Sequence, residues 1–130
     1  MGPVEAGEFS AAQRYEIDRT IRAAEQSSRC EFSVFVGTAG AEPRAFARRL
    51  HGSLVVPDRS VLLMVDPHAR AIEVVTGTEV RRTLSDAAVG LAVLQMQSAF
   101  AAGDLLGGLK RGVAMLAERA RAPHTLHAQE

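Results

Sequence analysis

The chain has 130 residues, of which 47% are hydrophobic and 23% are charged, so it is long enough for one packed domain and too short for two. Lysine plus arginine equals aspartate plus glutamate at 15 each, which excludes a net charge that would draw the protein to nucleic acid or to an anionic membrane. The composition is typical of a globular protein and excludes a disordered chain.

Compartment and covalent chemistry are constrained by what the sequence lacks. No stretch approaches the roughly 18 uninterrupted apolar residues of a membrane helix, and residues 1–9 have no apolar core of a signal peptide. The single cysteine, Cys30, excludes an intrachain disulfide, and we expect it to be a small buried hydrophobe rather than a reactive thiol. These features predict a cytoplasmic protein without a nucleic-acid partner, and they leave peripheral membrane association, a removed leader or anchor, and the oligomeric state open.

The first elements are a helix and a strand. Ser10 and Gln13 fit a capping box, and the apolar residues after them recur at helical spacing, which predicts an amphipathic helix ending near Ser28. Residues 31–36 alternate with the period of a strand, and Gly37 interrupts the run.

A second helix should begin at Pro43 and end at Gly52. We expect its arginines to form a solvated outward face: Arg44, Arg48 and Arg49. Residues 61–65 are continuously apolar, which predicts a strand buried on both faces at the centre of the sheet. Turn residues at 66–69 then connect it to an antiparallel strand at 72–76.

The last two elements are predicted to be helices. The first begins at Ser85 or Asp86, runs to about Ala102 and should be largely buried, because most of its circumference is apolar. The second is capped by Asp104 and ends before Pro123. The order αβαββαα predicts a three-layer α/β/α sandwich with a small mixed sheet, formed by residues 9–122 between flexible segments at 1–8 and 123–130.

A glycine-rich pattern connects these two helices, with Phe-x-x-Gly-Asp-x-x-Gly-Gly at positions Phe100, Gly103, Asp104, Gly107 and Gly108. It is preceded, without a gap in spacing, by the buried strand at 61–65, an Arg-initiated strand at 70–76 and a Leu-Ser-Asp-Ala segment at 84–87. In these motifs and in the order of its elements the chain resembles the TPM domain over roughly residues 8–122. That family is named after a thylakoid-lumen acid phosphatase, a photosystem repair protein and a nematode receptor modulator, and the resemblance extends to diverged actinobacterial members of unknown function.

The chain departs from the family pattern in its loops. TPM domains usually carry Asp-Asn-Gly before the buried strand, where this chain has Asp58, Arg59 and Ser60. The Gly-Tyr-Gly turn after the second strand retains its first glycine, but Thr78 and Glu79 replace the other two residues. The geometry of the family's loops therefore need not be preserved here.

Acidic residues flank the predicted hairpin at one end. Asp58 precedes one strand and residues 77–86 follow its antiparallel partner, so both belong to the same end of the sheet. Asp58, Glu79 and Asp86 could there supply the oxygen ligands that Ca²⁺ or Mg²⁺ requires, and the resemblance implies a metal site formed by acids at these positions. Structural roles would equally account for two of these acids, because Asp86 lies at a predicted helix start and Asp58 follows a proline in a predicted turn.

Candidates for other chemistry are weak. The hydroxyls near this end belong to Ser60, Thr76, Thr78 and Ser85, and none is paired in sequence with a base that would make it a nucleophile. The four histidines lack the spacing of a zinc site. No catalytic residue is assigned, and no cofactor beyond such a Ca²⁺ or Mg²⁺ ion.

Two hypotheses for function follow. The preferred one is a non-catalytic TPM-like binding or accessory module, whose loop edge contacts a protein partner and holds a divalent metal ion. The alternative, implied by the resemblance to the lumenal phosphatase, is a weak metal-assisted acid phosphatase that uses the same edge.

Overall fold

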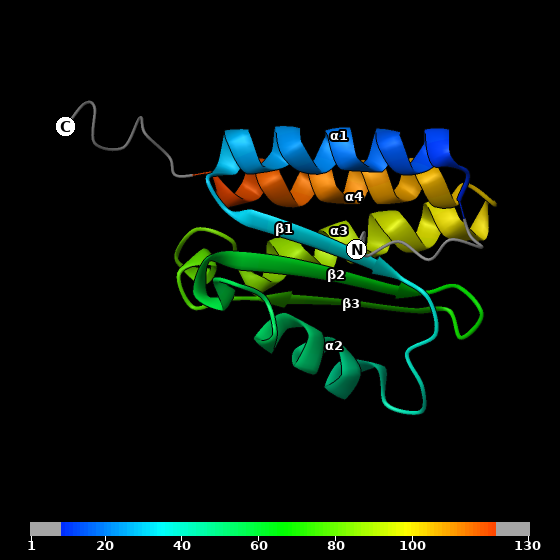
Figure 1. Cartoon of the computed structure of the whole chain (residues 1–130), viewed down its shortest axis with the longest axis horizontal. Helices are drawn as coiled ribbons and strands as arrows, with labels where there is room; N and C mark the ends of the chain where they lie inside the picture. The colour runs from blue at the N-terminus through cyan, green and yellow to red at the C-terminus, as the bar shows by residue number, and fades with distance from the viewer. Residues whose placement is uncertain (1–8, 122–130) are drawn as a thin grey trace.

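The computed structural model describes residues 9–121. In chain order its elements are α1 (Ala11–Ser28), β1 (Glu31–Val36), α2 (Pro43–Gly52), the short 3-10 helix η1 (Pro57–Arg59), β2 (Ser60–Asp66), β3 (Ala71–Thr76), a second 3-10 helix η2 (Val80–Arg82), α3 (Asp86–Ala101) and α4 (Leu105–Ala120). Helix α2 covers one face of the sheet, and α1, α3 and α4 lie on the other (Figure 1). The predicted three-layer α/β/α architecture is confirmed.

The sheet is small and mixed, in the order β1-β2-β3. Strand β1 pairs with β2 in parallel, with Glu31 opposite Ser60, and β2 pairs with β3 in antiparallel orientation, with Val61 opposite Thr76. The crossover through α2 and the hairpin therefore produce the topology expected from the sequence.

The apolar run of β2 is buried because both of its faces are covered. Its alternate residues Val61, Leu63 and Val65 join the core beneath α1, α3 and α4. Leu62 and Met64 point the other way and pack beneath α2. A strand with period-two side chains can be continuously apolar only when both faces are dry, which confirms the central position predicted for residues 61–65.

The predicted helix boundaries agree closely with the structure. The side chain of Ser10 accepts a hydrogen bond from the backbone N–H of Gln13, and the Gln13 side chain accepts one in return from the N–H of Ser10, which completes the capping box of α1. Ser85 rather than Asp86 caps α3, since its hydroxyl accepts from the N–H of Ala88 at 3.1 Å. Helix α4 ends at Ala120; Pro123 and the predicted flexible segments 1–8 and 123–130 lie outside the described residues.

The glycine-rich pattern is a helix junction. Gly103 has a φ of 86°, in the left-handed region that favours glycine, and Asp104 then caps α4 by accepting from the N–H of Gly107 at 2.8 Å. A Cβ atom added at Gly108 would overlap Phe100 of α3. Helix α4 therefore packs closely against α3 at this glycine.

Helix α3 is less buried than its sequence predicts. One stripe faces the core, formed by Ala88, Ala92, Met96 and Ala99. Leu91 and Leu94, however, are 49% and 61% exposed, because α4 and the sheet contact only one side of α3. The prediction of a largely buried helix was wrong. In the part of the chain that is described, no helix is long and apolar enough to cross a membrane.

Candidate binding groove at the loop end of the sheet

The loop end is the end of the sheet where β1 and β2 begin and β3 ends, together with η1 and η2. Two backbone hydrogen bonds join its loops: Gly77 N–H donates to the carbonyl of Ser60 at 3.0 Å, and Glu79 N–H donates to that of Asp58 at 2.9 Å. A Cβ atom on Gly77 would overlap the carbonyl oxygens of Pro57 and Asp58, so only glycine permits this approach. The sequence-based prediction that Asp58 and the 77–86 loop share one end of the sheet is confirmed.

The three predicted metal ligands do not converge on one point. All three side chains are exposed. Glu79 lines a groove beside α1 and α4, whereas Asp86 lines a cleft between α2 and α3. Among residues 9–121, no group of three or more His, Cys, Asp or Glu side chains is arranged to hold a metal ion. The residues as placed do not fit a three-ligand site, and metal binding at Asp58, Glu79 and Asp86 stays a prediction.

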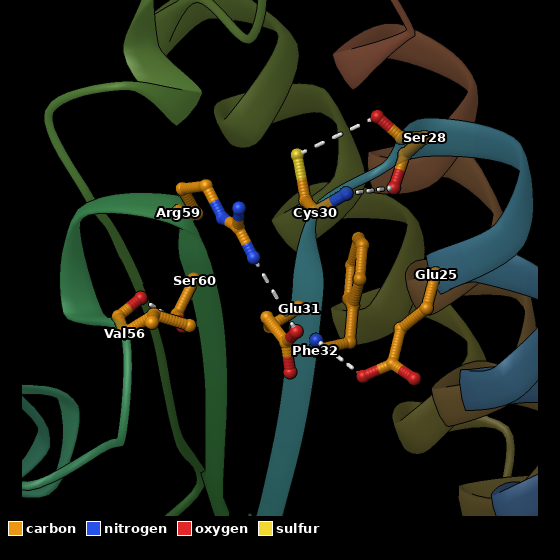
Figure 2. Close-up of polar contacts among 8 residues, drawn as sticks. All are labelled: Glu25, Ser28, Cys30, Glu31, Phe32, Val56, Arg59 and Ser60. Atoms are coloured by element: carbon orange, nitrogen blue, oxygen red, sulfur yellow. Dashed lines mark hydrogen bonds and ion pairs between the residues drawn. The ribbon is translucent and has the colours of Figure 1, made fainter.

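The loop-end groove has a volume of about 690 Å³ and is lined by ends of α1, α4, η1 and η2 together with the segment that connects α1 to β1. Its charged lining consists of Arg29, Arg59, Glu79 and Arg121. Three guanidinium groups and one carboxylate line the groove, and the Arg121 guanidinium also pairs with Glu118 at 3.9 Å. The excess of guanidinium donors suits a partner that presents acidic or carbonyl oxygens. Arg59 also forms an exposed ion pair with Glu31 at 3.8 Å (Figure 2).

Cys30 lies in this groove beside Ser28 (Figure 2). Burial raises the pKa of its thiol, against smaller opposing effects of the hydrogen bond with Ser28 and the charge of Arg59. The Cys30 Sγ is 3.8 Å from the carbonyl oxygen of Ser28, and the residue packs against the main core. The thiol is therefore protonated at neutral pH and is a poor nucleophile. Cys30 is partly buried, not fully buried as the sequence predicts.

Two hydroxyl groups at the loop end donate to backbone carbonyls. Ser60 Oγ donates to the carbonyl of Val56 at 2.6 Å, and Thr83 Oγ1 donates to that of Ala120 at 2.6 Å. His51 approaches Ser60, but its Nε2 is 3.1 Å from the backbone oxygen of that residue and makes no contact with the hydroxyl. These hydroxyls hold loops and helix ends in place instead of facing a base.

Two features escaped the sequence analysis. Arg44 is exposed, as predicted for the outward face of α2, but its guanidinium turns back to β3 and forms bonds with Glu73 Oε1 at 3.1 Å and with the Val74 carbonyl at 2.9 Å. Asp66, which the sequence places in a simple turn, is 3% exposed and joins two loops at the opposite end of the sheet. Residue type alone gave no signal for either contact, since both depend on long-range packing.

The fold defines the class of protein: a small α/β/α sandwich with a mixed sheet. Three solution structures share it. An N-terminal domain from P. gingivalis has a TM-score of 0.73 and 23% sequence identity, and the match covers 88% of this chain and 78% of that one. The N-terminal domain of the cg2496 protein of Corynebacterium glutamicum has a TM-score of 0.74 and 15% identity, with coverages of 92% and 80%, and the BA42 protein of Bizionia argentinensis has a TM-score of 0.78 and 20% identity, with coverages of 89% and 84%. At these identities the likeness establishes the fold alone.

Sequence similarity then assigns the family. The family described as domain of unknown function DUF5130 matches residues 2–117, and the chain belongs to it. The uncharacterised proteins Rv2468c and MT2543, from the H37Rv and CDC 1551 strains of Mycobacterium tuberculosis, are each 33% identical to it over 121 residues, which cover 88% of this chain and 72% of each relative.

Proposed function

We propose that this chain is a diverged TPM-like binding or accessory module, and that its loop-end groove is the surface that contacts a protein partner. The observation that carries the proposal is the state of the potential nucleophiles at this end. The thiol of Cys30 has a raised pKa, and the Ser60 and Thr83 hydroxyls donate to backbone carbonyls. Catalysis by any of them would first require breaking these contacts and supplying a base.

The shape and charge of the groove support binding. Its walls come from segments far apart in the chain, and the backbone bond between Glu79 and Asp58 fixes two of these segments relative to each other. A surface that is held rigid before binding loses less conformational entropy when a partner docks. The arginines Arg29, Arg59 and Arg121 favour a partner that presents acidic groups.

A divalent metal ion is a separate part of the proposal. The expected ligands are Asp58, Glu79 and Asp86, and the first two belong to loops that are already joined. Asp86 lines a different cavity, so a two-carboxylate site completed by backbone carbonyls and water is the arrangement that needs the least rearrangement. Such an ion would contribute charge that attracts acidic or carbonyl groups of the partner.

Titration of the purified chain with Ca²⁺ and with Mg²⁺, followed through its backbone amide resonances, tests the metal part directly. We expect shifts at the amides of Asp58 and Glu79, and their loss in Asp58→Asn. Asp18→Asn is a matched control, because Asp18 is exposed on α1, away from the loop end. Unchanged resonances at both loops would exclude the metal ion and leave the groove as a partner surface.

A further inference from the structure

Strand β3 has one unpaired edge, and the register identifies the backbone groups along it. Gly77 N–H bonds to β2, and the antiparallel pairs alternate between bonded and non-bonded. Residues 73 and 75 therefore exchange hydrogen bonds with β2. The N–H and C=O groups of Ile72, Val74 and Thr76 point away from it, toward the side of β3 where the described sheet has no further strand.

This edge is the floor of a cleft of about 630 Å³ between α2 and α3. Arg44 donates to the outward carbonyl of Val74, and Arg81 donates to that of Thr76. The outward N–H groups of Ile72, Val74 and Thr76 have no acceptor among the described residues. The floor of the cleft is thus rich in hydrogen-bond donors, which favours a ligand that supplies oxygen acceptors.

The two walls of the cleft differ in chemistry. The α2 wall carries Arg44, Arg48 and His51, with Glu73 of β3 paired to Arg44. The α3 wall is formed mainly by Val89, Gly90 and Val93, and α3 contains no charged residue after Asp86. Side chains of a strand alternate between two faces, so an extended chain lying on this floor would present every second residue to a basic wall and the others to an apolar wall.

We propose that this cleft binds an extended acidic segment of a partner protein as an additional strand beside β3, with acidic residues toward α2 and apolar residues toward α3. The incoming backbone bonds to the outward groups of residues 72, 74 and 76, in the manner of strand addition. Its carboxylates draw the guanidiniums of Arg44 and Arg81 away from the β3 carbonyls, because a charged acceptor makes the stronger hydrogen bond. The carbonyls thus become free to accept from the new strand.

A second copy of this chain fits the cleft less well. Two β3 strands related by a two-fold axis would bring the edge arginines of the two copies, Arg44 and Arg81, close to one another, and like charges in such positions are unfavourable. An acidic segment meets the same arginines with the opposite charge. The cleft is distinct from the loop-end groove, so partner binding at one can be measured separately from binding at the other.

A short synthetic peptide in which glutamate and valine alternate is the probe, with a lysine-valine peptide of equal length as its control. Titration into the ¹⁵N-labelled full chain should shift the amides of Ile72, Val74 and Thr76. The lysine peptide should bind at least about ten-fold more weakly. Equal binding of both peptides, or shifts confined to the loop-end groove, would overturn the proposal.

Variants locate the contact. Arg44→Gln and Arg48→Gln should each weaken binding of the glutamate peptide several-fold. Arg82→Gln should leave the affinity for this peptide unchanged, because Arg82 is not among the residues that line the cleft. Arg48 is exposed, so its variant tests the wall without disturbing the bonds of Arg44. If Arg44→Gln instead makes the chain self-associate and Arg48→Gln leaves the affinity for the peptide unchanged, the arginines only prevent edge-to-edge pairing of β3 and the proposal is wrong.

Discussion

The backbone N–H of Glu79 donates to the carbonyl oxygen of Asp58 at 2.9 Å. This bond joins the loop before β2 to the loop after β3, and with Gly77 it fixes the end of the sheet on which the proposed function depends. Gly77→Ala should lower the free energy of unfolding by about 1–3 kcal/mol or more, since the added methyl group overlaps the carbonyls of Pro57 and Asp58.

Urea denaturation measures this effect, and Gly90→Ala is its control. A Cβ atom at Gly90 meets no other atom within 4 Å, so alanine there should stabilise α3 by roughly 0.5–1 kcal/mol through helix propensity. If Gly77→Ala were as stable as the unmodified protein, the loops of the two strands would not be packed as described.

Asp66 should make stability depend on pH. Its carboxylate accepts from the N–H of Ala39 at 3.0 Å and from that of Ala69 at 3.2 Å, and chiefly the bond to Ala39 lowers the pKa of Asp66. A carboxyl group whose pKa is lower in the folded state stabilises the fold fully above its unfolded pKa of about 3.9. This contribution is lost as the pH falls below that value toward the lower folded pKa.

In Asp66→Asn the side-chain NH₂ group replaces one of the two oxygens that accept from backbone N–H groups, so a donor faces a donor. We expect the free energy of unfolding to fall by roughly 1–3 kcal/mol at neutral pH. The difference in unfolding free energy between the two proteins, measured by urea denaturation, should shrink as the pH is lowered below about 4. A difference that stays constant down to strongly acidic pH would show that the charge of Asp66 contributes nothing.

The junction between α3 and α4 predicts unequal effects of two glycine substitutions. Alanine at Gly108 would overlap Phe100 and Ala99, whereas alanine at Gly112 would overlap only the flexible side chain of Met96. Thermal unfolding should therefore show a loss of about 1–3 kcal/mol for Gly108→Ala. Gly112→Ala should be closer to neutral, because helix propensity offsets the shift of Met96. Equal losses at both positions would contradict this packing.

Cys30 should react slowly with iodoacetamide at neutral pH. Because burial raises its thiol pKa, only a small fraction is thiolate, and thiolate is the reactive form. Cys30 is the single cysteine of the chain, so mass spectrometry reports its modification without ambiguity. The rate should lie below that of a free cysteine derivative and rise on denaturation. A rate in the folded protein above that of the free cysteine derivative would identify an activated thiol. It would count against the proposal that the loop-end groove is a non-catalytic binding surface.

Much of the fold was predictable because local signals and the global structure agree. The capping box at Ser10, the doubly buried run at 61–65 and the Asp104 cap each specify an element through short-range chemistry. The exposure of Leu91 and Leu94 was not predictable, since the apolar character of α3 does not reveal which of its sides another element covers. Arg44 and Asp66 were missed for a similar reason: Arg44 pairs with Glu73, 29 residues away in sequence, and Asp66 accepts from Ala39, 27 residues away.

At the candidate site, hairpin topology correctly placed Asp58 and the 77–86 loop together, because the strand directions decide that outcome. Topology does not specify where side chains point. Asp86 follows the Ser85 cap onto α3 and lines the cleft, whereas Glu79 lines the loop-end groove. The groove itself depends on Arg29 and Arg121 at the ends of α1 and α4, and the relative position of those helices cannot be obtained from spacing along the chain.

Hydrolysis of a generic phosphate ester tests the proposed non-catalytic role most directly. The purified chain is assayed with Ca²⁺, Mg²⁺ or Mn²⁺ beside Asp58→Asn and Asp86→Asn variants, prepared identically. We predict that the unmodified protein turns over no more ester than either variant with any of the metals. Turnover by the unmodified protein that is abolished in both variants would contradict the binding-module proposal and establish the metal-assisted phosphatase instead.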